Sequence, residues 1–364
     1  MSTTGIQNRR DLFDIFQHTI EGTHDELVEN KKLQPGQSML KTFLIESNVT
    51  PEQLRDRLDI VEARKVDFDL QEIVVERNDS TYTFFLDSED SRFWALYTLE
   101  ESDDAKKVVA DMVSGVRNGL DYTWIPIEQQ RDIMDLGEFR DVGVSYNADD
   151  VFSEDYIEDR LDFGDLSVRS SGRGTSALFD ILDSHEELSS FLSLSSVGIR
   201  RQIGDSFVLE RVTHNGRFTT SGGNSIQLHL DTVDEIKNQY ATLLHKIEKN
   251  HRLSYESLEH GTGIDGAPLI INIDNEIEDV SEFVENIVTA KNPLRLWGAK
   301  TRLEEQYWKV KGVDLHNNDK YTMEICPEWI RLYLGKEACG NTALRIYSNI
   351  QRHYDSGATM EVQE

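Results

Sequence analysis

Short stretches in which polar and apolar residues alternate recur along the chain, and several lie next to turns rich in Asn, Asp or Gly. Ile226, Leu228 and Leu230 alternate with polar residues, and 330–334 shows the same spacing. A period of two predicts strands that bury one face, as in antiparallel sheets. Segment 103–116 has the apolar spacing of an amphipathic helix. The pattern therefore predicts an α+β protein with mostly antiparallel sheets, each covered by a helix.

The order of the predicted elements also repeats. Residues 207–230 can be laid over 310–334, so that IQLHL matches IRLYL as the last strand before a helix. A weaker third copy begins with the strand TFLIE (42–46) and a helix at 50–63, with Thr50 as its N-cap. It continues through a hairpin around Asn78-Asp79 to the helix at 103–116. The order strand, helix, three or four strands, helix is similar to that of TATA-binding-protein-like and helix-grip architectures. This similarity lies in element order and not in residue signatures. We therefore expect three related units.

These units divide the chain into segments. Its length of 364 residues, too long for one ordinary core, also indicates more than one domain. We expect, in chain order, an N-terminal helical segment (1–40), a first α+β unit with a helical connector (41–146), an acidic linker (147–165), a second α+β unit (166–256), a linker (257–268), a third and relatively basic α+β unit (269–355) and a tail (356–364).

Acidic residues outnumber basic residues throughout the chain. It contains 67 Asp and Glu against 38 Lys and Arg, a net charge of −29, and arginines outnumber lysines by 23 to 15. This composition is typical of cytoplasmic proteins of halophiles that accumulate salt, because molar salt screens charge repulsion beyond about 3 Å. A function that repels anions or binds cations is the alternative cause. We expect a protein of a halophilic archaeon.

Several features favour the cytoplasm. Cys326 and Cys339 are the only cysteines, too few for a disulfide framework or a paired-thiol metal site. No apolar run approaches the roughly 20 residues that span a bilayer. Acidic residues, and not an apolar leader, follow Arg9 and Arg10. We expect a cytoplasmic protein without a membrane partner.

The stretch LGKEACGNTA (334–343) is similar to a phosphate-binding loop. Gly335, Gly340 and Thr342 have P-loop spacing, but Asn341 stands where the motif requires lysine. The helix that follows is the last predicted element, whereas a P-loop follows the first strand of a larger parallel sheet. The aligned copy of the repeat joins its strand and helix without such a loop. We therefore interpret Asn341 and Thr342 as N-cap residues and expect no nucleotide site.

The loop SSGRGTS (170–176) is a better candidate for binding an anion. It lies between a predicted strand and a predicted helix, where backbone amides and arginines bind phosphate. The residues concerned are Arg169, Gly172, Arg173, Gly174 and Thr175. A flexible loop with Thr175 or Ser176 as a helix cap is the alternative interpretation.

No residue pattern indicates a metal site, a cofactor site or a catalytic centre. GTGIDG (261–266) precedes a strand, whereas a dinucleotide fingerprint follows one, so we expect a linker turn. The acidic loop 274–279 lacks the glycine and terminal glutamate of a calcium loop. His260 and Asp265 lie five residues apart, but no base–nucleophile set accompanies them. We expect no metal, no cofactor and no catalytic residues.

The charge balance reverses near the C-terminus. Between Lys291 and Tyr354 eleven basic residues oppose seven acidic ones, a local balance of +4, and aromatic residues lie between them. Basic and aromatic residues together on a sheet are typical of nucleic-acid contact. The candidate residues are Arg295, Trp297, Lys309, Lys311, Arg331, Tyr333, Arg345 and Arg352.

The sequence thus favours a non-catalytic binding or scaffold protein that contacts DNA, RNA or a nucleoprotein partner through its C-terminal unit. A protein–protein adaptor or homo-oligomer without nucleic acid is one alternative. An enzyme with a non-contiguous site around the Arg169–Arg173 loop is the second alternative.

Overall fold

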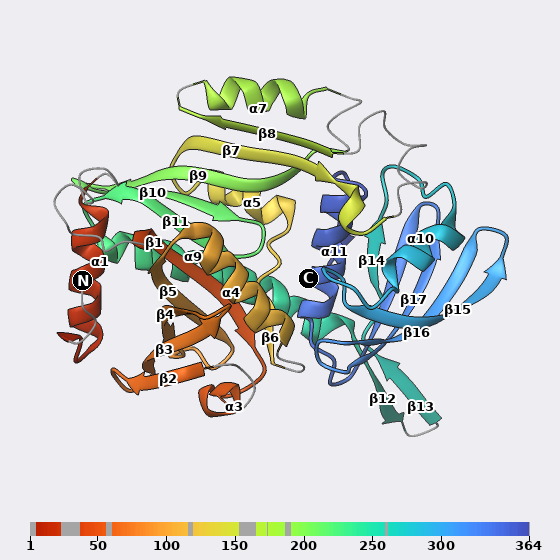
Figure 1. Ribbon diagram of the computed structural model, residues 1–364. Coiled ribbons are helices and arrows are strands. Elements are labelled where there is room, and N and C mark those ends of the chain that lie inside the picture. Colours follow the sequence, from red (N-terminus) through yellow and green to blue (C-terminus); the bar gives the residue numbers. More distant parts are fainter. Residues whose placement is uncertain are drawn as a thin grey trace. The chain divides into compact units, whose positions relative to one another are not determined.

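The computed structural model describes residues 5–22, 37–55, 60–115, 119–152, 165–172, 174–185, 191–258 and 261–363. Helices and strands alternate along the chain (Figure 1), and the strand pairs of defined register are antiparallel with one exception. This confirms the α+β class with antiparallel sheets. Internal contacts divide the chain into two compact units: unit 1 comprises Met1–Thr123, Asp132–Asp141 and Ser196–Asn238, and unit 2 comprises Trp124–Arg131, Val142–Ser195 and Gln239–Glu364.

Unit 1 is built on one sheet. In spatial order its strands are β2 (Ile60–Lys65), β3 (Leu70–Arg77), β4 (Ser80–Asp87), β5 (Phe93–Glu100), β1 (Gln37–Ser47), β11 (Arg217–Gly223), β10 (Ser206–Thr213), β9 (Ser193–Ile203) and β7 (Glu138–Asn147), with β6 (Leu120–Tyr122) beside β1. β7 and β9 also contain residues of unit 2. The hairpin expected at Asn78-Asp79 is confirmed, because both residues adopt left-handed backbone (φ 50° and 59°) between β3 and β4.

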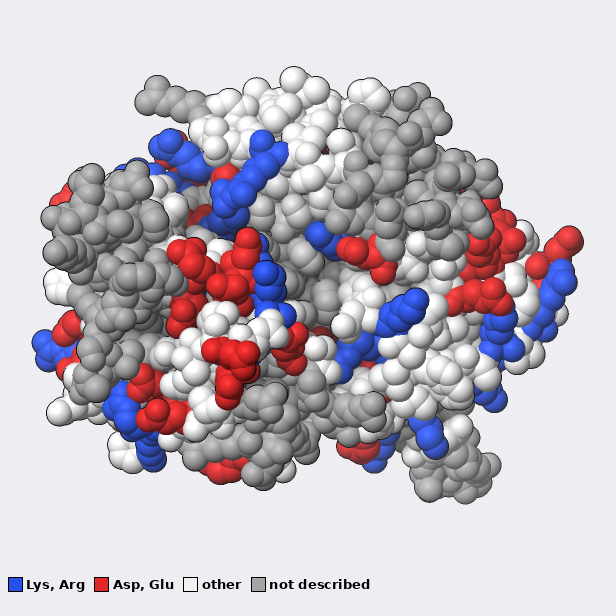
Figure 2. Space-filling view, in the orientation of Figure 1, with Lys and Arg blue, Asp and Glu red and all other residues white. Residues whose placement is uncertain are grey.

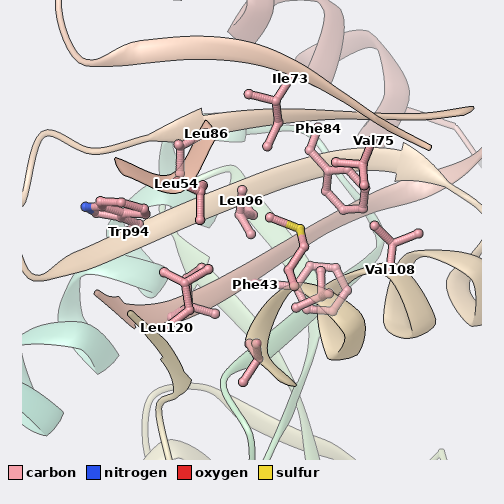
Figure 3. Packing of buried hydrophobic residues seen from close by; sticks show 14 of the residues in the cluster. Phe43, Leu54, Ile73, Val75, Phe84, Leu86, Trp94, Leu96, Val108 and Leu120 are labelled. Atoms are coloured by element: carbon pink, nitrogen blue, oxygen red, sulfur yellow. The ribbon is translucent and has the colours of Figure 1, made fainter. Parts of the chain in front are cut away.

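Helices cover both faces of this sheet. The helices of unit 1 are α1 (Arg9–Ile20), α3 (Pro51–Arg55), α4 (Ser102–Gly115) and the first half of α9 (Ile226–His251), and α5 (Ile127–Met134) follows β6. Figure 3 shows the buried cluster between α4 and the sheet. Its labelled members are Phe43, Leu54, Ile73, Val75, Phe84, Leu86, Trp94, Leu96, Val108 and Leu120. These residues alternate along their strands, as expected for a sheet with a buried face.

α1 covers the opposite face. Its buried side chains Leu12, Phe16 and Ile20 belong to one cluster with Phe85 and Tyr97 of the sheet. The Phe16 and Phe85 rings meet edge to face, with their centroids 6.1 Å apart. The sequence predicts a helix over about 9–30; α1 begins at Arg9 and ends at Ile20, and residues 23–36 lie outside the described part.

Two predicted elements have the wrong secondary structure. IQLHL (226–230) is the first part of α9 and not a strand, because Ser225 Oγ accepts a hydrogen bond from Leu228 N (3.2 Å) and starts a helix there. Ile226 and Leu230, four residues apart, pack together against the α1 side of the sheet. Thr50 caps α3 as expected, and the described part of that helix runs to Arg55. β2, and not helix, occupies the end of the predicted segment 50–63.

Unit 2 contains a second sheet. The elements of unit 2 are η2 (Ala148–Asp150), β8 (Asp165–Ser171), α7 (Thr175–Asp183), β12 (Arg252–Leu258), β13 (Gly261–Asp265), β14 (Leu269–Asn272), α10 (Val280–Ile287), β15 (Leu296–Glu304), β16 (Tyr307–Asp314), β17 (Lys320–Cys326), β18 (Trp329–Gly335), α11 (Asn341–His353) and β19 (Thr359–Glu361). The strand order of the second sheet is β13-β12-β18-β17-β16-β15, and β14 pairs with β18 and β19. β8 lies beside β7 in the first sheet. The expected linker 257–268 thus contributes to paired strands, and the expected tail 356–364 contains β19.

The three-unit repeat is not confirmed. The first and third expected copies share a strand order, β2-β3-β4-β5-β1 and β15-β16-β17-β18 with β14 beside β18. In the second copy β11 pairs with β1 instead of β8. IQLHL is helical where IRLYL forms β18. The two compact units also cut across the three expected copies.

A buried polar cluster joins α9 to the sheet of unit 1. Glu210 on β10, His229 on α9 and Thr42 on β1 are fully buried. The Glu210 carboxylate contacts His229 Nδ1, and His229 Nε2 lies 2.8 Å from Thr42 Oγ1. Because a buried polar group without a partner is costly, this cluster determines how α9 sits on the sheet.

Lys41 is buried on the other face of β1. Its side chain is 1% exposed, and the ammonium group donates a hydrogen bond to Met39 O (2.6 Å). Burial lowers the pKa of Lys41 to about 8; the charges of Glu101 and Glu100 oppose this shift, and that of Arg217 adds to it. The folded protein therefore carries a buried ammonium group at neutral pH, which destabilises it.

We expect the stability of the protein to rise with pH above about 8. The unfolded chain keeps the Lys41 proton up to its ordinary pKa of 10.5, whereas the folded protein releases it near 8. Because the unfolded state binds more protons in this window, the free energy of unfolding should increase by about 1–2 kcal/mol from pH 7.5 to 9.5. Urea denaturation measures it. The Lys41→Met variant should be more stable at pH 7.5 and lack the increase; a wild-type protein with constant stability across this window would contradict the assignment.

Candidate nucleic-acid interface

One face of the sheet in unit 2 carries polar, basic and aromatic side chains. Side chains of paired residues point to the same face of a sheet, and successive residues point to opposite faces. Val310, Met323 and Leu332 are fully buried on the inner face. The opposite face of β15–β18, here called the outer face, includes Trp297, Glu304, Tyr307, Lys309, Lys311, Lys320, Thr322, Glu324, Trp329, Arg331 and Tyr333.

The register aligns these side chains in rows. One row joins Arg331, Glu324 and Lys309 on three neighbouring strands. The next row joins Tyr333, Thr322 and Lys311. A third joins Trp297 through Val313 to Lys320. Basic and aromatic groups of all four strands therefore share one surface.

The charge of the outer face is opposite to that of the chain. Lys309, Lys311, Lys320 and Arg331 oppose Glu304 and Glu324, so these residues carry a formal charge of +2 (four minus two), whereas the chain carries −29. On the face of the molecule shown in Figure 2, basic side chains lie among acidic ones. The register of the sheet thus concentrates positive charge that the overall composition conceals.

Glu324 holds three neighbouring side chains in place. Its carboxylate accepts hydrogen bonds from Lys309 Nζ (3.0 Å), Tyr307 OH (3.0 Å) and Tyr333 OH (2.8 Å). Partial burial favours a higher pKa for Glu324, but these three hydrogen bonds outweigh it and lower the pKa. Burial and the bond to Glu324 raise the pKa of Tyr333 to about 12. The cluster therefore keeps a fixed charge pattern near neutral pH and orders two aromatic rings before any ligand binds.

The remaining rings of the outer face are arranged for stacking. The Trp329 and Tyr307 rings meet edge to face at 5.8 Å, and the Arg331 guanidinium lies 4.1 Å from the Trp329 ring centroid. Trp297, on the edge strand β15, is 56% exposed. Exposed rings with nearby guanidinium groups bind the flat faces of nucleic-acid bases.

The structure separates the sequence-predicted residues into two sets. Trp297, Lys309, Lys311, Arg331 and Tyr333 lie together on the outer face. Tyr307, Lys320 and Trp329 belong to the same face but are absent from the predicted set. Tyr307 and Trp329 each precede a predicted residue by two, which is a sequence signal for the same face, whereas Lys320 is identified only by its pairing with Val313.

The three other predicted arginines lie elsewhere. Arg345 is 0% exposed, forms an ion pair with Asp314 and donates a hydrogen bond from Nε to Leu294 O (3.0 Å). Arg295 is buried, and its Nη1 lies 3.4 Å from His316 Nδ1. Burial lowers the pKa of Arg352 on α11. Sequence composition does not distinguish these three buried or half-buried arginines from those of the outer face, and we leave them out of the interface.

The backbone amides of LGKEACGNTA bind carboxylates of the chain itself. Cys339 N donates to Asp319 Oδ2 (2.9 Å), and Gly340 N donates to Glu248 Oε1 (2.9 Å). A Cβ atom on Gly340 would lie 2.7 Å from Glu248 Cγ, so glycine is required for this close approach. In a P-loop such amides bind phosphate. Here two of them are occupied, which supports the expectation of no nucleotide site at this loop.

The helix cap at this loop differs from the prediction. Gly340 is the N-cap of α11, and Asn341 and Thr342 are its first helical residues. Their side chains point to tertiary partners instead of the helix end: Asn341 accepts a hydrogen bond from Tyr240 OH, and Thr342 donates one to Asp314. A buried partner far away in the sequence thus competes successfully with the local cap.

The candidate anion loop is only partly described. Arg173 lies outside the described residues. Gly172 has φ +103°, Gly174 is the N-cap of α7, and Thr175 is buried. Thr175 N donates to Gly172 O (3.2 Å), so that amide is already used within the loop. Anion binding near Arg169 stays a prediction.

The other sequence motifs do not form a second site. GTGIDG contributes strand β13 instead of a linker turn. His260 lies outside the described residues, which leaves its pairing with Asp265 a prediction. Within the described residues, no group of three or more His, Cys, Asp or Glu is arranged to hold a metal ion. Among the same residues, no helix is both long and apolar enough to cross a membrane.

Sequence comparisons relate the whole chain to one family. Residues 1–364 match the family described as "MJECL33-like protein". The chain is also 30% identical, over 396 residues of alignment, to "Uncharacterized protein MJECL33" of Methanocaldococcus jannaschii, with 99% of this chain and 95% of the relative covered.

We expect the Asp314–Arg345 ion pair to be essential for unit 2. Both side chains are fully buried, and the charge of Arg345 helps to lower the pKa of Asp314 against the effect of burial. Asp314→Asn leaves the Arg345 charge without its partner and should lower the free energy of unfolding by about 3–5 kcal/mol. The double variant Asp314→Leu/Arg345→Met should lose much less. Urea denaturation distinguishes them, and equal losses would show that the pair's charge is not the cause.

Proposed function

This chain belongs to the MJECL33-like protein family, and we propose that it is a non-catalytic protein that binds DNA or RNA through the outer face of β15–β18. The observation that carries the proposal is the gathering of four basic and four aromatic side chains around Glu324 on that face. Lys and Arg neutralise phosphates, and aromatic rings stack on bases. An anionic ligand with flat apolar groups fits both requirements.

The most exposed lysines supply the contacts to phosphate. Lys311 and Lys320 are exposed, whereas Lys309 is half-buried and bound to Glu324. The ammonium group of Lys309 can contact a phosphate only after it breaks its bond to Glu324. Lys311 and Lys320 are therefore the first residues to meet the backbone of an approaching nucleic acid, and Lys309 mainly maintains the positive field.

We further propose that the protein works in the salt-rich cytoplasm of a halophilic archaeon, on the basis of its net charge of −29 and its preference for arginine. Molar salt reduces the gain from counterion release, so stacking must supply a larger share of the binding free energy. Base–aromatic stacking contributes about 1–3 kcal/mol per base and depends less on charge. The four aromatic rings of the outer face can supply this stacking.

Removing two lysines should reduce both the affinity and its dependence on salt. For the Lys311→Ala/Lys320→Ala variant we expect about tenfold weaker binding of fluorescent oligonucleotides in 0.2 M KCl, measured by anisotropy. The slope of log K against log[KCl] should fall by roughly one to two, because each phosphate contact contributes about 0.7–0.9. Trp297→Ala should weaken binding about tenfold in 0.2 M and in 2 M KCl alike, because stacking is not screened.

A matched control removes the same charge from unit 1. Lys106 and Lys107 are exposed on α4, and Lys106→Ala/Lys107→Ala should bind like wild type. If both double variants weaken binding equally, the charge of the whole chain and not the outer face is responsible. If wild type binds neither DNA nor RNA at either salt concentration, the nucleic-acid function is wrong, and an acidic protein becomes the ligand to test.

A further inference from the structure

We infer that the ligand of the outer face is single-stranded and that the hairpin of β12 and β13 extends the stacking surface with Tyr255. This inference rests on the proposed function, since it names the class of nucleic acid that the same site takes. Three observations lead to it: the register of β12 beside β18, the exposure of Tyr255 and Ile264, and the position of Glu324 at the centre of the face.

The pairing of β12 with β18 determines the side to which Tyr255 points. The two strands run parallel, with Arg252 opposite Leu334 and Leu253 opposite Gly335. Gly335 is two residues from Tyr333 and so lies on the outer face of β18. Leu253 shares that face, and Tyr255, two residues further along β12, does so as well. The outer face therefore continues from β18 onto the hairpin.

The hairpin presents an apolar pair to solvent. Tyr255 lies opposite Ile264 in the register of β12 and β13. The two side chains are 83% and 68% exposed, respectively. Figure 1 shows that the hairpin projects from the sheet of unit 2. The exposed aromatic ring and the exposed branched aliphatic side chain together form an apolar platform. A planar base that stacks on this platform removes apolar surface from water.

The dimensions of the surface fit several unpaired bases. Trp297 on β15 and Tyr255 on β12 lie at opposite edges of the outer face. Four strand-to-strand spacings of about 4.8 Å separate β12 from β15, so the two rings are roughly 19 Å apart across the sheet. Tyr333 lies between them. A strand with splayed bases that crosses the sheet can contact Trp297 at one edge, and Tyr333 and Tyr255 on the two neighbouring strands at the other.

The central carboxylate disfavours a duplex. A duplex presents phosphates and sugars on its outside and hides the faces of its bases, so it would place phosphates over Glu324 and leave the rings unused. A single strand can turn its bases to the rings and its phosphates to Lys311 and Lys320. The geometry therefore points to single-stranded DNA or RNA, bound by stacking and positioned by peripheral lysines.

The test compares oligonucleotides and ring variants in the full-length protein. Fluorescence anisotropy in 0.2 M and 2 M KCl measures the affinity for dT12, dT4, a 12-nucleotide U-tract and a 12-base-pair duplex. We expect wild type to bind the 12-mer single strands at least tenfold more tightly than the duplex. Tyr255→Ala should weaken dT12 binding about five- to tenfold and leave dT4 binding, which Trp297 and Tyr333 support, within twofold.

Two further variants separate stacking from other effects. Tyr255→Phe keeps the ring and should bind within twofold of wild type. Phe68→Ala removes an equally exposed aromatic ring (85%) from unit 1 and should have no effect. Because Tyr255 is exposed, its variants should retain the circular dichroism spectrum and melting temperature of wild type.

The outcomes distinguish this inference from the proposed function. Equal affinity for duplex and single strand overturns the single-strand inference, while nucleic-acid binding stands. Full binding of dT12 by Tyr255→Ala shows that the hairpin is not part of the surface. No binding of any oligonucleotide overturns the proposed function and this inference together.

Discussion

The buried ion pair between Arg345 and Asp314 is the interaction on which the arrangement of unit 2 depends. Arg345 is on α11 and Asp314 ends β16, so the pair attaches the last helix to the inner face of the sheet. Thr342 donates a hydrogen bond to the same carboxylate. Because neither charge can return to water without opening the unit, α11 stays on the inner face. The opposite face is then available to a ligand.

The two faces of this sheet show how one strand serves packing and binding at once. Along β18, Ile330, Leu332 and Leu334 are buried, and the residues between them are half-buried. A pleated strand cannot place both sets on the same side, so a well-packed inner face requires that Trp329, Arg331 and Tyr333 point outward. The proposed interface is thus a direct consequence of the packing that makes the sheet stable.

Buried polar clusters have similar structural roles in both units. In unit 1, His229 bridges Glu210 and Thr42 between α9 and two strands. In the loop before α11, the amides of Cys339 and Gly340 bind Asp319 and Glu248. Each cluster contains groups that are familiar from catalytic or phosphate-binding sites. In each case the partner belongs to the protein itself, and the result is a fixed position for a helix.

The amino-acid sequence by itself determined the α+β class, the Asn78-Asp79 hairpin and the basic, aromatic C-terminal region. These features depend on local periodicity, on turn residues that adopt positive φ, and on composition. Only the tertiary structure decided that IQLHL is helical, because a run of five residues fits both a period of two and a helix pair four residues apart. It also decided that Arg345 is internal while Arg331 lies on the outer face. Whether a charged side chain is buried depends on a partner such as Asp314, 31 residues away in the chain, and no local pattern contains that information.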